Sequence, residues 1–196
     1  MPIPAPARIA LHTPRLQLAP EDCAATLEVH DLMWRNHAHF ARWNPVVDRQ
    51  ELDVEFVLEL LAGEVRAWQA GEVLRLWVRL REAPHTLIGW VKIDGLTAGA
   101  LHSGRLGYAI DAEHQRRGYM QEALCAARDF VFSAQVNLHR LQASVLEDNA
   151  ASIRVLRACA FEEIGVARAY LRVGGQWRDH LLLQCINAAW RDTPSR

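Results

Sequence analysis

Residues 74–81 alternate strictly between two kinds of side chain. Leucine or valine occupies the even positions, and arginine or tryptophan occupies the odd ones. Only an extended strand places every second residue on one face. The segment therefore predicts a strand with an aliphatic face toward the core. Residues 86–93, rich in strand-forming side chains, and residues 105–111, with apolar side chains at alternate positions, predict two more strands.

A helical period appears further along the chain, at residues 118–133. The apolar side chains that share one helical stripe there are Tyr119, Ala123, Leu124, Ala127, Phe130 and Val131. The other elements that we expect are a strand at 15–18, helices at 22–43 and 50–70, a strand at 140–146, a short helix capped by Asn149, and a hairpin of 164–173 and 176–186 around Gly174 and Gly175. This order predicts one α/β domain, a mixed sheet covered by helices.

Composition limits the possible classes of protein. The 196 residues are 51% apolar and 23% charged, which suits one domain, with a net charge of -1 that predicts no broad attraction to nucleic acid or membranes. We expect the domain at 13–190, between flexible segments at 1–12 and 191–196. No apolar stretch approaches about 20 residues and no signal peptide is visible, so we expect a cytoplasmic protein. The four cysteines are scattered and predict no metal site.

The segment 115–120 joins a predicted strand to the predicted helix at 118–133, and it reads Gln-Arg-Arg-Gly-Tyr-Met. Free backbone N–H groups and the positive end of the helix dipole favour an anion such as a pyrophosphate. Gly118 allows a ligand to approach the backbone closely, and Arg116 or Arg117 can add positive charge. A polar loop that ends in glycine is also common without any ligand, so the segment alone leaves both interpretations open.

The wider pattern resembles the GNAT superfamily of N-acetyltransferases. Residues 115–119 match the family pattern Gln/Arg-x-x-Gly-x-Gly/Ala, while Met120 replaces the usual small last residue. The segments that resemble the RimJ-type ribosomal-protein N-terminal acetyltransferases are 117–123, the turn Asn149-x-x-Ser152, Tyr170-Leu171 and 175–180. The resemblance covers about residues 14–190. It implies the GNAT acyl-CoA N-acyltransferase fold, a largely antiparallel central sheet flanked by helices.

The resemblance also implies acetyl-CoA, without a metal. The residues that it places around acetyl-CoA are Tyr108, Ala109 and Ile110 on the strand, Gln115, Arg116, Arg117, Gly118, Tyr119 and Met120 in the loop and helix, and Asn149 and Ser152 at the next helix. Many family members use a tyrosine as the acid that protonates the leaving thiolate, but this chain has Leu156 at that position. Related ribosomal-protein enzymes use a serine, which makes Ser152 the candidate acid here, although a serine in a first helical turn also commonly satisfies a backbone N–H.

The general base is the weakest point of the resemblance. Relatives carry a glutamate directly before the glycine of the next strand, but Ile164 precedes Gly165 here. We take Glu163 as the candidate base, with Glu162 as the alternative, and both can equally be plain surface charges. A protein N-terminus has a pKa of about 8, so part of it is neutral near pH 7 and a strong base is not required.

The implied acceptor is a protein N-terminus, an alanine or serine of a small-subunit ribosomal protein, and the enzyme is expected to be a monomer or homodimer. The candidate acceptor-binding residues are Trp43, Trp90, Tyr170, Trp177 and Asp179. Aromatic residues are more often simply core, and Asp179 can instead pair with a neighbouring arginine. Two other functions remain open: an acetyltransferase for a small amine (a polyamine, an amino acid or an aminoglycoside), and a non-catalytic module for CoA binding or ribosome assembly.

Overall fold

The structure is a computed structural model that describes residues 9–45 and 47–191. Its elements are β1 (Leu11–His12), β2 (Leu16–Ala19), η1 (Cys23–Ala25), α1 (Thr26–Arg35), α2 (His37–Ala41), α3 (Val54–Gln69), β3 (Leu74–Leu80), β4 (Ala83–Thr97), β5 (Ser103–Ile110), η2 (Ala112–His114), α4 (Tyr119–Phe132), β6 (Arg140–Leu146), α5 (Ala150–Ala158), β7 (Glu162–Val173) and β8 (Gln176–Ile186). In these residues eight strands form one sheet, ordered β1-β2-β3-β4-β5-β6-β8-β7. Neighbouring strands run antiparallel, except that β5 and β6 run parallel, which confirms the mixed sheet.

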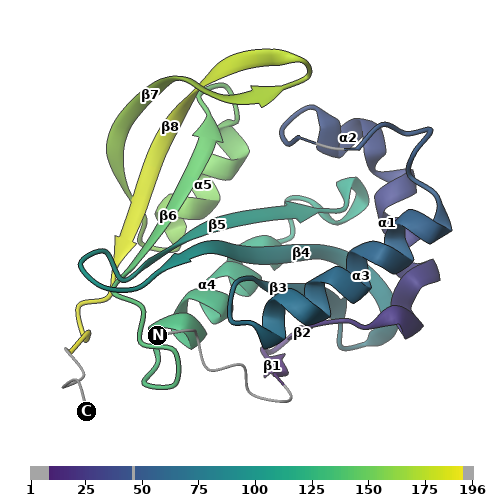
Figure 1. Cartoon of the computed structure of the whole chain (residues 1–196), viewed down its shortest axis with the longest axis horizontal. Coiled ribbons are helices and arrows are strands. Elements are labelled where there is room, and N and C mark those ends of the chain that lie inside the picture. The colour runs from purple at the N-terminus through teal and green to yellow at the C-terminus, as the bar shows by residue number, and fades with distance from the viewer. Residues whose placement is uncertain (1–8, 46, 192–196) are drawn as a thin grey trace.

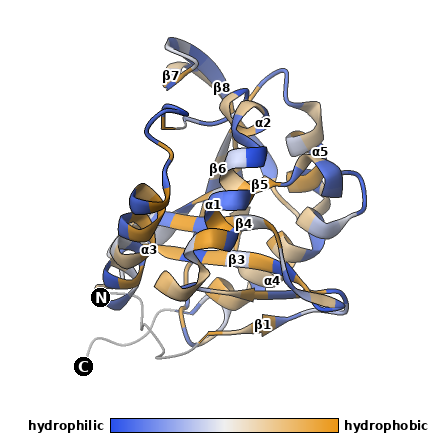
Figure 2. Cartoon of the chain, turned by 90° about the vertical axis from the view of Figure 1, so that its right-hand side faces the viewer, coloured by the Kyte–Doolittle hydropathy of each residue, from blue (hydrophilic) through white to orange (hydrophobic). Residues whose placement is uncertain are grey.

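Helices cover both faces of the sheet (Figure 1). The alternation in β3 divides the core between them, because Leu76 and Val78 pack in the cluster that contains α4 and α5. Trp77 packs instead in the cluster formed by α1 and α3. Figure 2 shows the apolar residues gathered along β3 between these layers. Within the described ranges, no helix has the length and hydropathy needed to cross a bilayer.

Several local predictions are confirmed closely. The strand expected at 140–146 is β6, and the helix expected at 118–133 is α4, which begins and ends within one residue of that range. Asn149 caps α5 as expected. Gly174 and Gly175 join β7 to β8 with φ of +58° and +78°, which glycine adopts without steric cost.

The single helix expected at 22–43 is wrong. The chain forms η1, α1 and α2 instead, and Asn36 separates α1 from α2. The Asn36 side chain is buried, donates to the Leu32 carbonyl oxygen at 3.0 Å, and accepts from the Ala112 N–H at 2.9 Å. A tertiary hydrogen bond to a segment 76 residues away therefore fixes the end of α1.

The folded unit begins earlier than expected. Residues 11 and 12 form β1, which pairs with β2, and Ile9 is buried against the main core. The expected flexible segment 1–12 is therefore wrong for residues 9–12. Residues 1–8 and 192–196 of the expected flexible ends lie outside the described residues.

Candidate functional site

β5 and β6 are paired at one end only. Their pairs run from Ser103 with Arg140 to Leu106 with Ala143. Further along, residues 107–110 of β5 keep their pairs with β4, and residues 144–146 of β6 keep their pairs with β8. In the described chain, the backbone groups of residues 107–110 that face β6 therefore have no strand partner. This is where the resemblance places the acyl thioester.

β4 allows the end of β5 to approach closely. A Cβ at Gly89 would lie 2.3 Å from the Ala109 carbonyl oxygen and 3.1 Å from the Ile110 Cα. Gly89 is therefore a steric requirement for the position of the strand end.

We expect Gly89→Ala to lower the free energy of unfolding by about 1–3 kcal/mol, because the methyl group must displace backbone atoms. Gly63→Ala in α3 is the control, since its Cβ would meet nothing closer than 3.9 Å. Chemical denaturation monitored by circular dichroism measures both variants. Equal stability of the two would show that β5 shifts without cost.

The loop before α4 has a backbone shaped for an anion. Arg116 and Gly118 have φ of +61° and +77°, both in the left-handed region, on either side of Arg117. Such alternation turns successive N–H groups toward one side. Among the described residues no side chain caps the start of α4, whereas Asp53 caps α3 and Asn149 caps α5. The first N–H groups of α4 and its positive dipole end therefore remain available for a phosphate.

The side chains of this loop differ in exposure and contacts. Arg116 and Arg117 are exposed, Tyr119 is half-buried, and Met120 is buried in the core. The larger Met120 side chain, at the position where the family pattern has glycine or alanine, therefore points into the core. The Gln115 amide lies 3.0 Å from the His39 imidazole of α2, so α2 and the loop are in contact.

Arg15 is a cation of this site that no local pattern in the sequence marks. Its guanidinium donates to the Arg117 carbonyl oxygen at 2.8 Å and lies 4.5 Å from the centre of the Tyr119 ring. It also forms an ion pair of 2.7 Å with Glu122 in the first turn of α4. The start of β2 therefore holds the start of α4, and positive charge lies directly beside Gly118.

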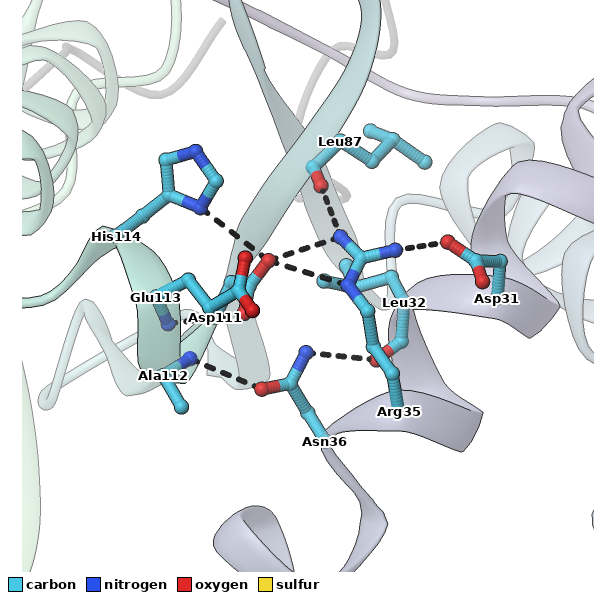
Figure 3. Close-up of polar contacts among 9 residues, drawn as sticks. All are labelled: Asp31, Leu32, Arg35, Asn36, Leu87, Asp111, Ala112, Glu113 and His114. Carbon is cyan, nitrogen blue, oxygen red and sulfur yellow. Dashed lines mark hydrogen bonds and ion pairs between the residues drawn. The ribbon is translucent and has the colours of Figure 1, made fainter.

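Asp111, at the end of β5, anchors the same loop from the other side (Figure 3). Its buried carboxylate accepts from the Arg35 guanidinium at 2.9 and 3.2 Å, and from the Glu113 N–H at 3.2 Å. The His114 ring nitrogen lies 3.2 Å from the same carboxylate. Burial favours the neutral acid, but these hydrogen bonds and the positive charge of Arg35 prevail and lower the pKa of Asp111. A carboxylate that is ionised at neutral pH therefore connects α1 to the loop that precedes α4.

Two hydroxyl groups meet at the start of α5. The Asn149 Oδ1 accepts from the Ser152 N–H at 3.1 Å, which fixes the first turn. The Tyr108 hydroxyl lies 2.5 Å from the Ser152 Oγ and 3.2 Å from the Ser152 carbonyl oxygen, so its single proton has two acceptors within reach. Leu156, at the position of the family's tyrosine, is completely buried. The hydroxyl beside α5 therefore comes from β5.

The candidate base is already engaged. Glu163 forms an ion pair with Arg157 near the C-terminal end of α5, more than one helical turn after Ser152. Ile164, in place of the expected glutamate, has 47% of its surface exposed. The described contacts do not bring Glu163 to Ser152 or Tyr108.

The candidate acceptor residues occupy two regions. Trp90 of β4 pairs with Ala109, and Trp43 follows α2; both are half-buried. Tyr170 and Trp177, 39% and 66% exposed, belong to the β7–β8 hairpin, whose tip lies at the same end of the molecule as α2 (Figure 1). The two hairpin aromatics are therefore not core residues.

Asp179 is also on the hairpin and already has partners. It accepts from the Ala169 N–H at 2.8 Å and pairs with Arg168 at 2.5 Å. Its neighbour Arg178 lies 3.6 Å from Asp148 instead. These contacts favour the alternative in which Asp179 forms an ion pair, with Arg168 as the partner.

Comparison with known sequences agrees with this geometry. Residues 15–162 match the family model described as "Acetyltransferase (GNAT) domain". The chain is 37% identical over 101 residues to the probable N-acetyltransferase YjcK of Bacillus subtilis, matching 52% of this chain and 55% of that protein. It is 36% identical over 110 residues to the [ribosomal protein uS5]-alanine N-acetyltransferase of Escherichia coli, matching 56% of this chain and 55% of that protein. The chain thus spans about half the length of these relatives.

Solved structures extend the likeness over nearly the whole chain. The ribosomal-protein-S5-alanine acetyltransferase of Vibrio fischeri superposes with a TM-score of 0.87 at 29% identity, covering 94% of this chain and 100% of that one. RimJ of Mycobacterium smegmatis, solved in complex with CoA-disulfide, superposes with a TM-score of 0.86 at 25% identity, covering 98% and 92%. The family model, the diverging strands and the uncapped helix lead to one conclusion: the chain belongs to the GNAT acetyltransferase family.

Proposed function

We propose that this protein transfers the acetyl group of acetyl-CoA to the α-amino group of a protein N-terminus, an alanine or serine of a ribosomal protein. One observation carries the proposal. The uncapped start of α4, with Gly118 in the left-handed region, lies next to the unpaired end of β5. A diphosphate on the N–H groups of the helix directs the attached arm along an open strand edge. The names of the E. coli and V. fischeri relatives support the choice of acceptor.

Each part of acetyl-CoA has candidate partners. The N–H groups of residues 118–120 face the diphosphate, and Arg116 and Arg117 add charge beside it. The backbone of Tyr108, Ala109 and Ile110 holds the pantetheine arm. An N–H group directed at the thioester carbonyl stabilises the negative charge that develops there, an effect worth a few kcal/mol.

The amine requires little activation. With a pKa of about 8, roughly one tenth of an N-terminal amine is neutral at pH 7. Glu163 is the base expected from the sequence, but its ion pair with Arg157 does not support that role. An α-amino acceptor is therefore compatible with a site in which Glu163 is already paired, whereas a lysine amine, with a pKa of about 10.4, depends far more on a base.

Peptides that differ only in residue one test the proposal. We expect CoA release from acetyl-CoA with free N-terminal alanine or serine, and at least tenfold less with the same peptides blocked at the N-terminus. Each peptide carries an internal lysine, and spermidine serves as the small-amine control. Equal rates on free and blocked peptides would exclude N-terminal transfer, and turnover of spermidine alone would indicate the small-amine function. CoA binding without any turnover would indicate a non-catalytic module.

A further inference from the structure

The contact between Tyr108 and Ser152 extends the proposed function and rests on it. The two side chains come from different elements, 44 residues apart in the chain. Tyr108 lies on β5 beyond the last pair with β6, and its half-buried ring reaches the first turn of α5 on the α4 and α5 side of the sheet. The pair therefore lies beside the open end of the two strands.

Ser152 is held from two directions. Its N–H donates to the Asn149 Oδ1 at 3.1 Å, which fixes the backbone. The Tyr108 hydroxyl, 2.5 Å from the Ser152 Oγ, fixes the side chain. A serine that only satisfied a backbone N–H would need neither the contact with the Tyr108 hydroxyl nor a position beside the unpaired ends of β5 and β6. This arrangement favours a hydroxyl whose direction matters.

We propose that Tyr108 is a positioning residue that donates its O–H to the Ser152 Oγ, so that Ser152 relays the proton of the attacking amine to the leaving sulfur. In this step the amine nitrogen bonds to the carbonyl carbon, and the carbon–sulfur bond breaks with its electron pair moving to sulfur. The N–H proton passes to the Ser152 Oγ while the Oγ–H proton passes to sulfur. The products are the amide and the free thiol, and Ser152 ends as it began.

The Tyr108 hydroxyl is suited to donate a hydrogen bond at every pH at which the enzyme works. Burial raises the pKa of its hydroxyl, and the hydrogen bond with Ser152 offsets this only in part. The phenol therefore stays protonated throughout the range in which enzymes of this kind work. In the proposed arrangement the phenol donates its proton to the Oγ, which leaves the proton of Ser152 itself free for sulfur.

The relay is also consistent with the ion pairs that Glu163 and Asp179 already form. It needs no separate base, because one hydroxyl both accepts and gives a proton. Glu163 can then remain paired with Arg157, and Asp179 with Arg168. The buried Leu156 leaves the sulfur without the family's tyrosine, and Ser152 supplies the missing donor.

Five variants test the relay, with turnover measured at saturating acetyl-CoA and peptide. Ser152→Ala should lower kcat about a hundredfold, within the range of a lost proton-transfer group. Tyr108→Phe should lower it about tenfold, and the double variant Tyr108→Phe/Ser152→Ala should be no slower than Ser152→Ala alone, because Tyr108 acts through Ser152. Ser152→Thr should keep most of the activity because it retains a hydroxyl. Ser152→Val, which has the same shape without the hydroxyl, should lose it. Calorimetry should give all five a Kd for CoA within about threefold of the parent.

The outcomes separate the two levels of the proposal. If the effects of Tyr108→Phe and Ser152→Ala multiply, or if Ser152→Val matches Ser152→Thr, the relay is wrong although the acetyltransferase assignment stands. If Tyr108→Phe instead weakens CoA binding or lowers the melting temperature in proportion to its loss of turnover, its role is structural and the relay is again wrong. If the unmodified protein binds no CoA, the proposed function itself fails.

Discussion

Asp111→Ala is expected to lower the free energy of unfolding by about 3 kcal/mol. The substitution removes the carboxylate that accepts from the Arg35 guanidinium and the Glu113 N–H, although Arg35 keeps its contacts with Asp31 and the Leu87 carbonyl oxygen. Removing one partner of a buried ion pair costs about 3–5 kcal/mol. Because the Arg35 side chain keeps 34% exposure, water can recover part of the loss, which places the effect at the lower end. Denaturant unfolding followed by tryptophan fluorescence measures it.

The matched control is Asp129→Ala in α4. Asp129 also pairs with an arginine, Arg128, at 2.6 Å, but its side chain is 66% exposed. Exposed pairs contribute at most about 1 kcal/mol. If Asp111→Ala is no more destabilising than Asp129→Ala, the network of Figure 3 does not hold the loop.

The same carboxylate gives the stability a dependence on pH with a definite sign. The pKa of Asp111 in the folded state is lower than in the unfolded chain, where it is about 3.9. The folded state therefore binds fewer protons, and the contribution is complete above about pH 5 and is lost as the pH falls through the unfolded and then the folded value. Asp111→Asn, which cannot titrate, should lose less stability than the parent between about pH 5 and pH 3. Parallel curves would contradict the lowered pKa.

Elements with a local cause could be predicted from the sequence. The apolar stripe of α4 and the Asn149 cap of α5 depend on neighbours within a few residues. The alternation of β3 predicted its strand and its aliphatic face toward the core, whereas the packing of Trp77 in a second cluster on the other face was not predicted. The free N–H groups at the start of α4 also have a local cause, because Gly118 has no side chain that could cap them.

Features that depend on distant contacts could not be predicted. Nothing near Asn36 indicates a helix end, which its hydrogen bond to Ala112 creates. Arg15 reaches the start of α4 from more than 100 residues away. The resemblance places Tyr108 beside acetyl-CoA, yet its hydroxyl meets Ser152 only because β5 and α5 pack together. Side-chain chemistry at the site thus arises where elements converge, which no single periodicity encodes.

Gly118→Ala is expected to raise the Kd for CoA by about ten- to a hundredfold, equivalent to about 1.4–2.7 kcal/mol. Gly118 holds φ at +77°, and its added Cβ would lie 3.4 Å from the Arg15 guanidinium, on the surface where the diphosphate must approach the backbone. An alanine either keeps this conformation at a cost of about 1–2 kcal/mol or relaxes it and turns the first N–H groups of α4 away. Both outcomes weaken the anion site.

Gly99→Ala separates strain from ligand contact. Gly99 has φ of +68°, and no atom of the described residues lies within 4 Å of its added Cβ, so an alanine in this turn between β4 and β5 carries similar backbone strain. The two variants should lose similar stability in thermal unfolding, but only Gly118→Ala should lose CoA affinity in calorimetry. Equal affinity of the two variants for CoA would remove the start of α4 from the binding site. Because the diphosphate is the most strongly charged part of the ligand near this backbone, that result would leave the proposed acetyl transfer without its main contact.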